Sequence, residues 1–143
     1  MNKFQGYNIE DLHPGMSESF TKTITDADIL MFCAVSTDVN PLHINDEYAK
    51  TTRFGGRVAH GMLTASLVSA VLGNKMPGPG CLYLGQTLKF TAVVRPGDTV
   101  TATVIVREVF VEKKRVIFDT VCRVGNTVVA EGASTLLCTS EKD

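Results

Sequence analysis

The sequence lacks an excess of charge of either sign, and this argues against several kinds of partner. Its 143 residues include 14 Lys and Arg against 15 Asp and Glu, a formal net charge of -1. Proteins that bind nucleic acid or an anionic membrane surface generally carry a basic patch or a long basic run. We therefore expect neither nucleic acid nor a membrane among the partners.

Long hydrophobic runs and clustered cysteines are also missing. The longest apolar stretch, Met62 to Leu72, is interrupted by Thr and Ser and is too short to span a bilayer. The first residues lack the apolar core of a signal peptide. No Cys-x-x-Cys or Cys/His spacing indicates a metal site. We expect a cytoplasmic protein with no metal, whose reduced cysteines are mostly buried: Cys33, Cys81, Cys122 and Cys138.

The length fits one domain, residues 1–143. Alternating side chains predict a first strand over Ser17 to Ile24, and Thr25 reads as the N-cap of a helix over Asp26 to Val35. A second helix, Gly61 to Gly73, is apolar on almost every side, which predicts that it is buried.

The second half of the chain reads as strands separated by turns. Arg95 to Asp98 has Pro followed by Gly, as in a type II turn, and Gly125-Asn126 is a hairpin signal. The expected strands are Leu82 to Val94 with a bend near Gly85, Thr99 to Val109, Val116 to Val124 and Thr127 to Cys138. These patterns predict an α+β protein with about five mainly antiparallel strands around one long helix.

The residues most suggestive of chemistry lie in Ser36-Thr37-Asp38-Val39-Asn40-Pro41-Leu42-His43. Pro41 fixes its own φ and disfavours helical geometry at Asn40. Asp38 and His43 therefore lie on either side of a rigid bend, where both side chains can reach one small molecule. A carboxylate and an imidazole that share a water can act as an acid/base pair.

This block resembles the signature of the MaoC-like (R)-specific enoyl-CoA hydratases, in which Asp-x-Asn-Pro-Leu-His is followed after five residues by a small residue, here Ala49. Two further blocks resemble that family, so the likeness covers most of the chain: Phe54-Gly55-Gly56-Arg57-Val58-Ala59-His60-Gly61-Met62-Leu63 and Tyr83-Leu84-Gly85-Gln86 with Lys89-Phe90. The resemblance implies a single hot-dog domain that forms a homodimer or a higher homo-oligomer. It also implies reversible addition of water to a trans-2-enoyl-CoA, giving a (3R)-3-hydroxyacyl-CoA without a cofactor, because coenzyme A is part of the substrate.

The resemblance makes Asp38 and His43 the catalytic pair. We expect His43 to take a proton from water while Asp38 orients that water and relays a proton to the substrate, although the sequence does not separate these roles. The backbone N–H of Gly61, at the positive end of a helix, is the expected oxyanion-hole donor, a role that the resemblance also gives it.

Four further residues have open roles. His60 reads as a positioning or capping residue rather than a second base, and Asn40 as a tie across the bend or a contact to the water. The resemblance places Ser69 near the substrate, but it could equally be a buried serine bonded to its own helix. Arg57 could meet a phosphate of the acyl-CoA or an acidic neighbour.

Two other functions stay open. A hot-dog thioesterase is the nearest enzymatic rival, but many of these have a carboxylate on the central helix, and Met62 to Leu72 contains neither Asp nor Glu. A non-catalytic acyl-CoA-binding module would have no need of both Asp38 and His43. The sequence does not indicate the acyl-chain length.

Overall fold

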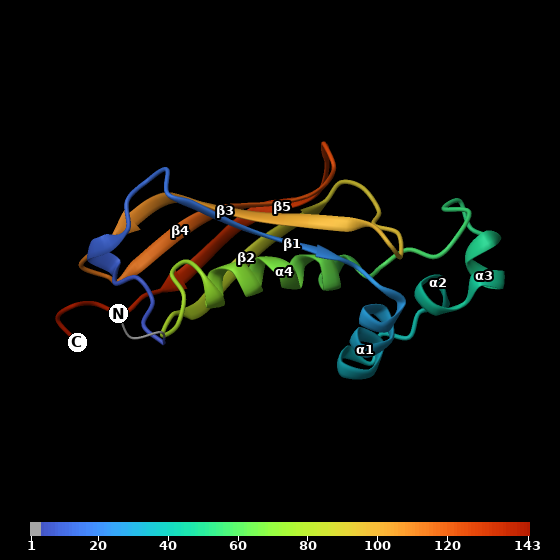
Figure 1. Ribbon diagram of the computed structural model, residues 1–143, viewed down its shortest axis with the longest axis horizontal. Coiled ribbons are helices and arrows are strands. Elements are labelled where there is room, and N and C mark those ends of the chain that lie inside the picture. Colours follow the sequence, from blue (N-terminus) through green and yellow to red (C-terminus); the bar gives the residue numbers. More distant parts are fainter. Residues whose placement is uncertain (1–3) are drawn as a thin grey trace.

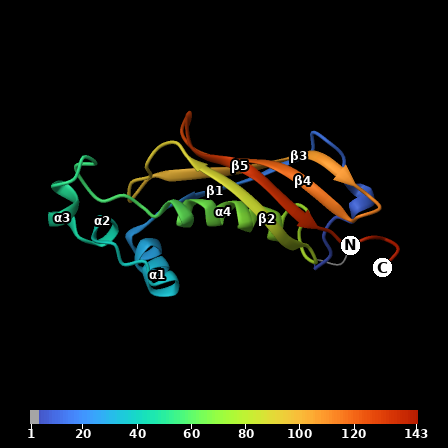
Figure 2. The same cartoon turned by 180° about the vertical axis from the view of Figure 1, so that it is seen from behind.

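The computed structural model, described for residues 4–143, contains a five-stranded antiparallel sheet in the order β1-β3-β4-β5-β2. The long helix α4 (Gly61–Asn74) lies along one face of the sheet, as Figures 1 and 2 show. The strands are β1 (Ser17–Thr23), β2 (Leu82–Phe90), β3 (Thr99–Phe110), β4 (Arg115–Val124) and β5 (Thr127–Leu137). The predicted α+β fold is confirmed.

Three further α-helices form a separate group at one end of this body: α1 (Asp26–Ser36), α2 (Pro41–Ile44) and α3 (Asp46–Lys50). In Figure 1 they lie beyond the N-terminal end of α4, while the described ends of the chain lie at the opposite end. A short 3₁₀ helix, Ile9–Asp11, precedes β1. None of the helices among residues 4–143 is both long and apolar enough to cross a membrane.

The start and end of α1 follow from local side-chain chemistry. Thr25 is the N-cap: its hydroxyl accepts from the Asp28 N–H at 3.1 Å, and the Thr25 N–H donates to the Asp28 carboxylate at 2.9 Å. This reciprocal pair is a capping box, which satisfies two backbone donors at once. Thr37 ends the helix with a φ of 64°, an unusual value for a β-branched residue. The chain therefore turns sharply just before Asp38.

The core forms where one side of α4 meets the sheet. Along β3, alternate side chains point inward, and Val100, Ala102 and Val104 are completely buried. Leu67, Val68, Val71 and Leu72 of α4 belong to the same buried cluster. Burial of these apolar side chains is the main force that fixes α4 against the sheet.

The prediction that α4 is buried on every side is wrong for the single chain. Met62 is 56% exposed, and Ser66, Ser69 and Gly73 are exposed as well. These positions recur every three or four residues, so they form one stripe along the helix. The five strands cover only one side of α4 and leave this stripe open.

The strand predictions hold, with small differences at the ends. The bend near Gly85 is an irregularity in the β2–β5 register between Tyr83 and Gly85, but β2 ends at Phe90 instead of Val94. In the predicted turn, the Asp98 N–H donates to the carbonyl of Arg95 at 3.0 Å, and Gly97 has a φ of 92°. Residues 91–98 therefore form a connection that runs past the start of α4, where the Ala59 N–H donates to the carbonyl of Val94 at 2.7 Å.

All the cysteines are free thiols, as expected, and all but the half-buried Cys81 are buried. Burial raises the pKa of Cys122 to about 11 and that of Cys138 to about 12. Since the thiolate is the reactive form, these two thiols are poorly reactive near neutral pH.

Replacing Gly132 by alanine tests the packing between β5 and β2. A Cβ at this position would lie 1.8 Å from the backbone oxygen of Thr87, so the two strands would have to move apart. We expect Gly132→Ala to lower the free energy of unfolding by about 2 to 3 kcal/mol, measured by urea denaturation. The control is Gly56→Ala in the loop before α4, where the nearest atom to a Cβ would be an Arg95 guanidinium nitrogen at 3.5 Å, an ordinary contact. It should leave stability unchanged or raise it by about 0.5 kcal/mol. Equal effects of the two changes would contradict the packing described.

Candidate active site

The bend between Asp38 and His43 forms as the sequence predicts. Asn40 has a non-helical backbone with φ -50° and ψ 125°, and Pro41 is the first residue of α2. The Asn40 side-chain oxygen accepts from the Leu42 N–H at 3.0 Å, and the Asn40 N–H donates to the Asp38 carboxylate at 3.3 Å. Asn40 thus ties the bend together through its amide, while it does not line the cavity described below.

His43 is oriented by a hydrogen bond to the backbone of a distant segment. Its Nδ1 lies 2.7 Å from the carbonyl oxygen of Val58, and the side chain is buried. A carbonyl oxygen can only accept a hydrogen bond, so the proton is assigned to Nδ1. In the neutral ring, Nε2 then keeps a free lone pair and can accept a proton.

His60 packs directly against His43. The two rings stack with their centroids 3.8 Å apart, and Phe32 contacts the His60 ring at 4.8 Å. The His60 Nε2 donates to the backbone carbonyl of Asp38 at 3.0 Å and lies 3.5 Å from the Cys33 sulfur. Although His60 is the N-cap residue of α4, its side chain makes no capping hydrogen bond. His60 therefore occupies the predicted capping position, but its ring joins the Asp38 segment and His43 instead of capping the helix.

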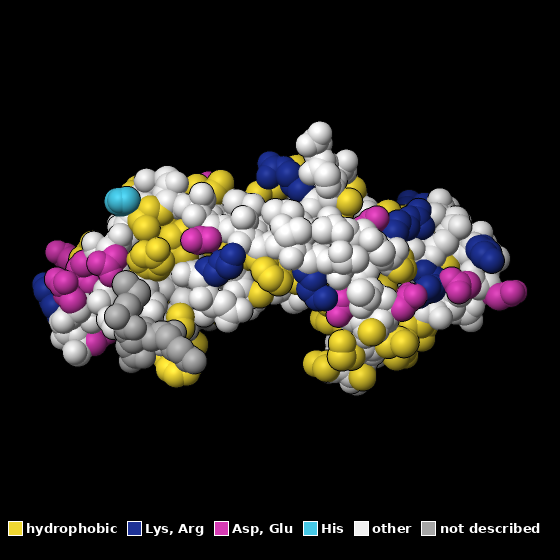
Figure 3. Space-filling model, viewed as in Figure 1, with side chains coloured by type: hydrophobic (Ala, Val, Ile, Leu, Met, Phe, Trp, Pro, Cys, Tyr) yellow, Lys and Arg dark blue, Asp and Glu magenta, His cyan; other side chains and the backbone are white. Residues whose placement is uncertain are grey.

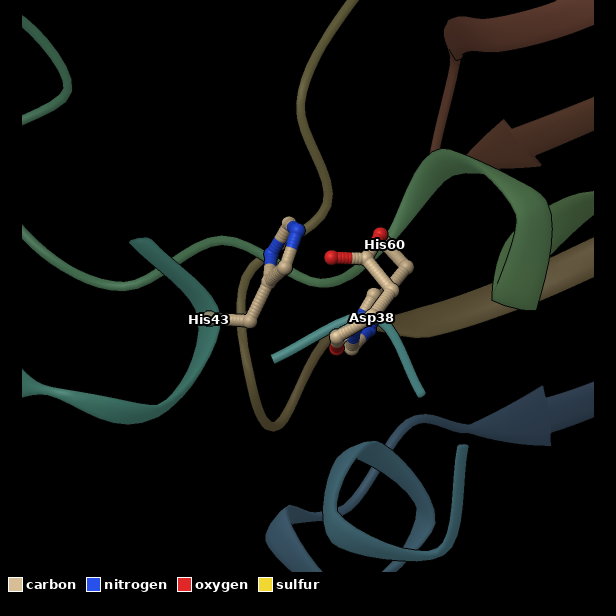
Figure 4. Close-up of side chains that lie close together, drawn as sticks. All are labelled: Asp38, His43 and His60. Carbon is tan, nitrogen blue, oxygen red and sulfur yellow. Dashed lines mark hydrogen bonds between the residues drawn. The ribbon is translucent and has the colours of Figure 1, made fainter. Parts of the chain in front are cut away.

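Asp38, His43 and His60 converge on one small space. One carboxylate oxygen of Asp38, one ring nitrogen of His43 and one ring nitrogen of His60 lie within 4.8 Å of one another. Figure 4 shows the Asp38 carboxylate directed toward the His43 ring. One carboxylate and two imidazoles could also bind a divalent ion. Such an ion would occupy the lone pairs of the Asp38 carboxylate and of the histidine nitrogens that bind it.

A cavity of about 320 Å³ opens beside this group. Its rim is exposed and carries Asp38, Met62, Phe90 and Val93. We call its buried lining residues other than His43 the floor: Val58, Ala59, His60, Thr64, Val94 and Val129. Apart from His60 and Thr64, the floor is apolar, and these two side chains carry the unpartnered buried atoms His60 Nδ1 and Thr64 Oγ1.

Gly61 lies at the rim, at the first position of α4. No partner for its N–H occurs among the described residues, as expected for the first turn of a helix. A Cβ on Gly61 would lie 2.8 Å from the ring of Phe90. A side chain on residue 61 would therefore displace the Phe90 ring, a contact that the sequence did not reveal.

Two arginines fix the segment that carries Val58. Arg57 donates to Asp26 at 2.8 Å and to Asp46 at 2.7 Å, and these carboxylates raise the pKa of the Arg57 guanidinium. The acidic-neighbour interpretation of Arg57 is confirmed. Arg95 donates to the carbonyls of Phe54, Gly56 and Arg57. The loop that positions His43 is thus joined to α1, to α3 and to the connection after β2.

Ser69 does not lie at this cavity. It is an exposed residue on α4, about two turns beyond the catalytic candidates, and it does not line the cavity. The interpretation of Ser69 as a buried serine is wrong, while its role near a substrate stays a prediction.

Sequence reasoning missed Val58, Thr64, Phe90 and Arg95. Thr64 left one signal, since it is the first polar residue after Gly61, one turn along a mostly apolar helix. Val58 acts through its backbone carbonyl, and Phe90 and Arg95 act across the fold, so their side-chain types gave no indication of a role in the site.

The fold and the site define a hot-dog protein with paired acidic and imidazole side chains at the start of its central helix. The model of the MaoC like domain matches residues 12–133, and the chain therefore belongs to this family.

Curated relatives and solved structures agree with this assignment. The chain is 53% identical to the (R)-specific enoyl-CoA hydratase of Rhodospirillum rubrum, over 90% of this chain and 89% of that protein. It is 45% identical to the 3-hydroxybutyryl-CoA dehydratase of Methylorubrum extorquens, over 86% of this chain and 78% of that protein. An unliganded R-hydratase from Pseudomonas aeruginosa superimposes with a TM-score of 0.90 at 38% identity, covering 96% of this chain and 88% of that one.

Proposed function

We propose that this protein is an (R)-specific enoyl-CoA hydratase, which adds water reversibly to a trans-2-enoyl-CoA and gives a (3R)-3-hydroxyacyl-CoA. One observation carries the proposal: the Asp38 carboxylate and a ring nitrogen of His43 lie within 4.8 Å of each other, and both residues line the same cavity as Gly61, the first residue of α4. The activities named for the relatives from R. rubrum and M. extorquens support it.

The chemistry follows from these three groups. Water held between Asp38 and His43 loses a proton to His43 Nε2 as its oxygen bonds to Cβ of the substrate. The electron pair of the double bond moves toward Cα and the thioester oxygen, where the N–H of Gly61 stabilises the negative charge. The proton then passes through Asp38 to Cα. One water is consumed, and the enzyme returns to its starting state.

Hydration of crotonyl-CoA tests this proposal directly. We expect the purified protein to abolish the enone absorbance of crotonyl-CoA without releasing thiol, and an (R)-specific 3-hydroxyacyl-CoA dehydrogenase to accept the product. Asp38→Asn and His43→Gln should each lower kcat by at least about 10²-fold, because each removes a proton-transfer group. Thiol release would indicate a thioesterase, and binding without reaction a non-catalytic module.

We further propose that no metal or other cofactor takes part, since the groups above supply proton transfer and charge stabilisation. In the same assay, EDTA should leave the rate unchanged, and added Zn²⁺ should inhibit by binding Asp38 and His43. Loss of activity in EDTA that Zn²⁺ restores would contradict this part.

We also assign the protein to the cytoplasm, in accord with its free cysteines. Fractionation of source cells tests that assignment.

Gly61→Ala tests the proposed oxyanion hole. The added Cβ should push the Phe90 ring aside and crowd the thioester, so we expect kcat to fall about 10- to 100-fold. Measuring kcat for the double variant Gly61→Ala/Phe90→Ala separates the two causes. If crowding of Phe90 were the whole effect, the double variant would recover full activity. Persistent loss supports the need for an open N–H beside the substrate.

We propose that the protein forms a homodimer across α4 and the free edge of β2. β2 is an edge strand of the sheet, where Leu82 and Leu84 are exposed. In Figure 3 the surface is hollowed beside the end helices, and hydrophobic side chains gather over α1. A second copy would cover this surface together with the open stripe of α4, and an unpaired strand edge readily accepts another strand.

Sedimentation velocity tests the homodimer. We expect a species of about twice the chain mass of 15.5 kDa. Leu84→Lys should shift it toward the monomer, because a charge would be buried at the edge of β2. Val111→Lys is the control, since Val111 is about equally exposed but lies in the turn between β3 and β4. A monomeric wild-type protein would contradict the proposal.

A further inference from the structure

The floor of the cavity carries two polar side chains that the proposed chemistry does not use. His60 and Thr64 are each 2% exposed, and both line the same cavity. Thr64 lies in the first turn of α4 and His60 directly precedes the helix, and the cavity brings the two side chains to one space. Neither His60 Nδ1 nor Thr64 Oγ1 has a hydrogen-bond partner among residues 4–143.

The hydrogen bond on the other side of the His60 ring determines what Nδ1 can bind. Because Nε2 donates to the carbonyl of Asp38, it carries the proton, and Nδ1 of the neutral ring is an acceptor. The Thr64 hydroxyl can donate or accept. Buried polar atoms in native proteins almost always have partners. The cavity volume of about 320 Å³ far exceeds the roughly 30 Å³ that one water occupies in the liquid.

The size of coenzyme A relative to the cavity indicates which part of the substrate meets the floor. Coenzyme A is too large for the cavity and must leave through the exposed rim at Met62, Phe90 and Val93. With the thioester oxygen at Gly61 and Cβ beside His43, the end of the acyl chain points away from the rim. It therefore points toward the floor, where Thr64 lies one turn deeper along α4 than Gly61.

We propose that His60 and Thr64 form a polar subsite that holds an ordered water beyond a short acyl chain, and that this subsite selects four-carbon 2-enoyl thioesters. A six-carbon chain would displace the water and leave both polar atoms facing methylene groups. Displacing a well-ordered water with a group that cannot replace its hydrogen bonds weakens binding. The inference rests on the proposed function, because it assigns the acyl end of the substrate to the floor.

The test compares crotonyl-CoA and trans-2-hexenoyl-CoA in wild-type protein and in Thr64→Val. Valine has nearly the shape of threonine but cannot bind water, so the floor becomes apolar. We expect wild-type protein to prefer crotonyl-CoA in kcat/KM. In Thr64→Val this preference should fall about tenfold, chiefly through a lower KM for hexenoyl-CoA. Thr64→Ser keeps the hydroxyl and should keep most of the preference.

Thr120→Val is the matched control. Thr120 is also buried, but it lies on β4, where its hydroxyl accepts from the Gln86 side chain at 3.2 Å. This change should leave the chain-length preference at the wild-type value. An unchanged preference in Thr64→Val, an equal loss for both substrates, or a wild-type preference for hexenoyl-CoA would overturn the inference while leaving the hydratase proposal intact.

A binding measurement tests the subsite even if the protein does not hydrate any thioester. If no thioester is hydrated, calorimetric titration with butyryl-CoA and hexanoyl-CoA uses the same variants. Tighter binding of butyryl-CoA by wild-type protein, with a loss of that difference in Thr64→Val alone, supports the subsite even without turnover. No difference between the two ligands, or none between the variants, overturns it.

Discussion

The hydrogen bond from His43 Nδ1 to the carbonyl of Val58 is the interaction on which the site depends. It joins α2 to the segment that leads into α4, two parts of the chain that are 15 residues apart. It also determines which nitrogen of His43 keeps a lone pair. Without it, Asp38 and His43 would still be close in sequence, but the imidazole would have no fixed tautomer or direction.

The residues of the site come from two parts of the fold: the sheet with α4, and the helical group from α1 to α3. Burial of α4 against the sheet fixes the start of that helix, which supplies Gly61, His60 and Thr64. The group from α1 to α3 supplies Asp38 and His43 and is held by the ion pairs of Arg57 with Asp26 and Asp46. Stacking of His60 on His43 closes the contact between the two parts. A site built this way has its donors fixed before a ligand arrives, which lowers the reorganisation needed during reaction.

Much of the fold and part of the site could be predicted from the sequence, because their causes are local. The strands were predicted from the alternation of side chains, the start of α1 from Thr25 as an N-cap, and the bend between Asp38 and His43 from Pro41. The burial of α4 could not be judged this way. An apolar residue such as Met62 gives the same sequence pattern whether it faces the sheet or the open side of the helix. Only the width of the sheet decides which side of the helix is covered.

The sequence by itself determined which reactive side chains are present and that a bend keeps Asp38 and His43 off a common helix face. Only the tertiary structure decided their directions, because Val58, Arg95 and Phe90 act through contacts between segments far apart in the chain. It likewise decided that Thr64 faces a cavity instead of the core. Local patterns encode backbone conformation, whereas the partners of a side chain depend on how the elements pack, and this packing is a property of the whole chain.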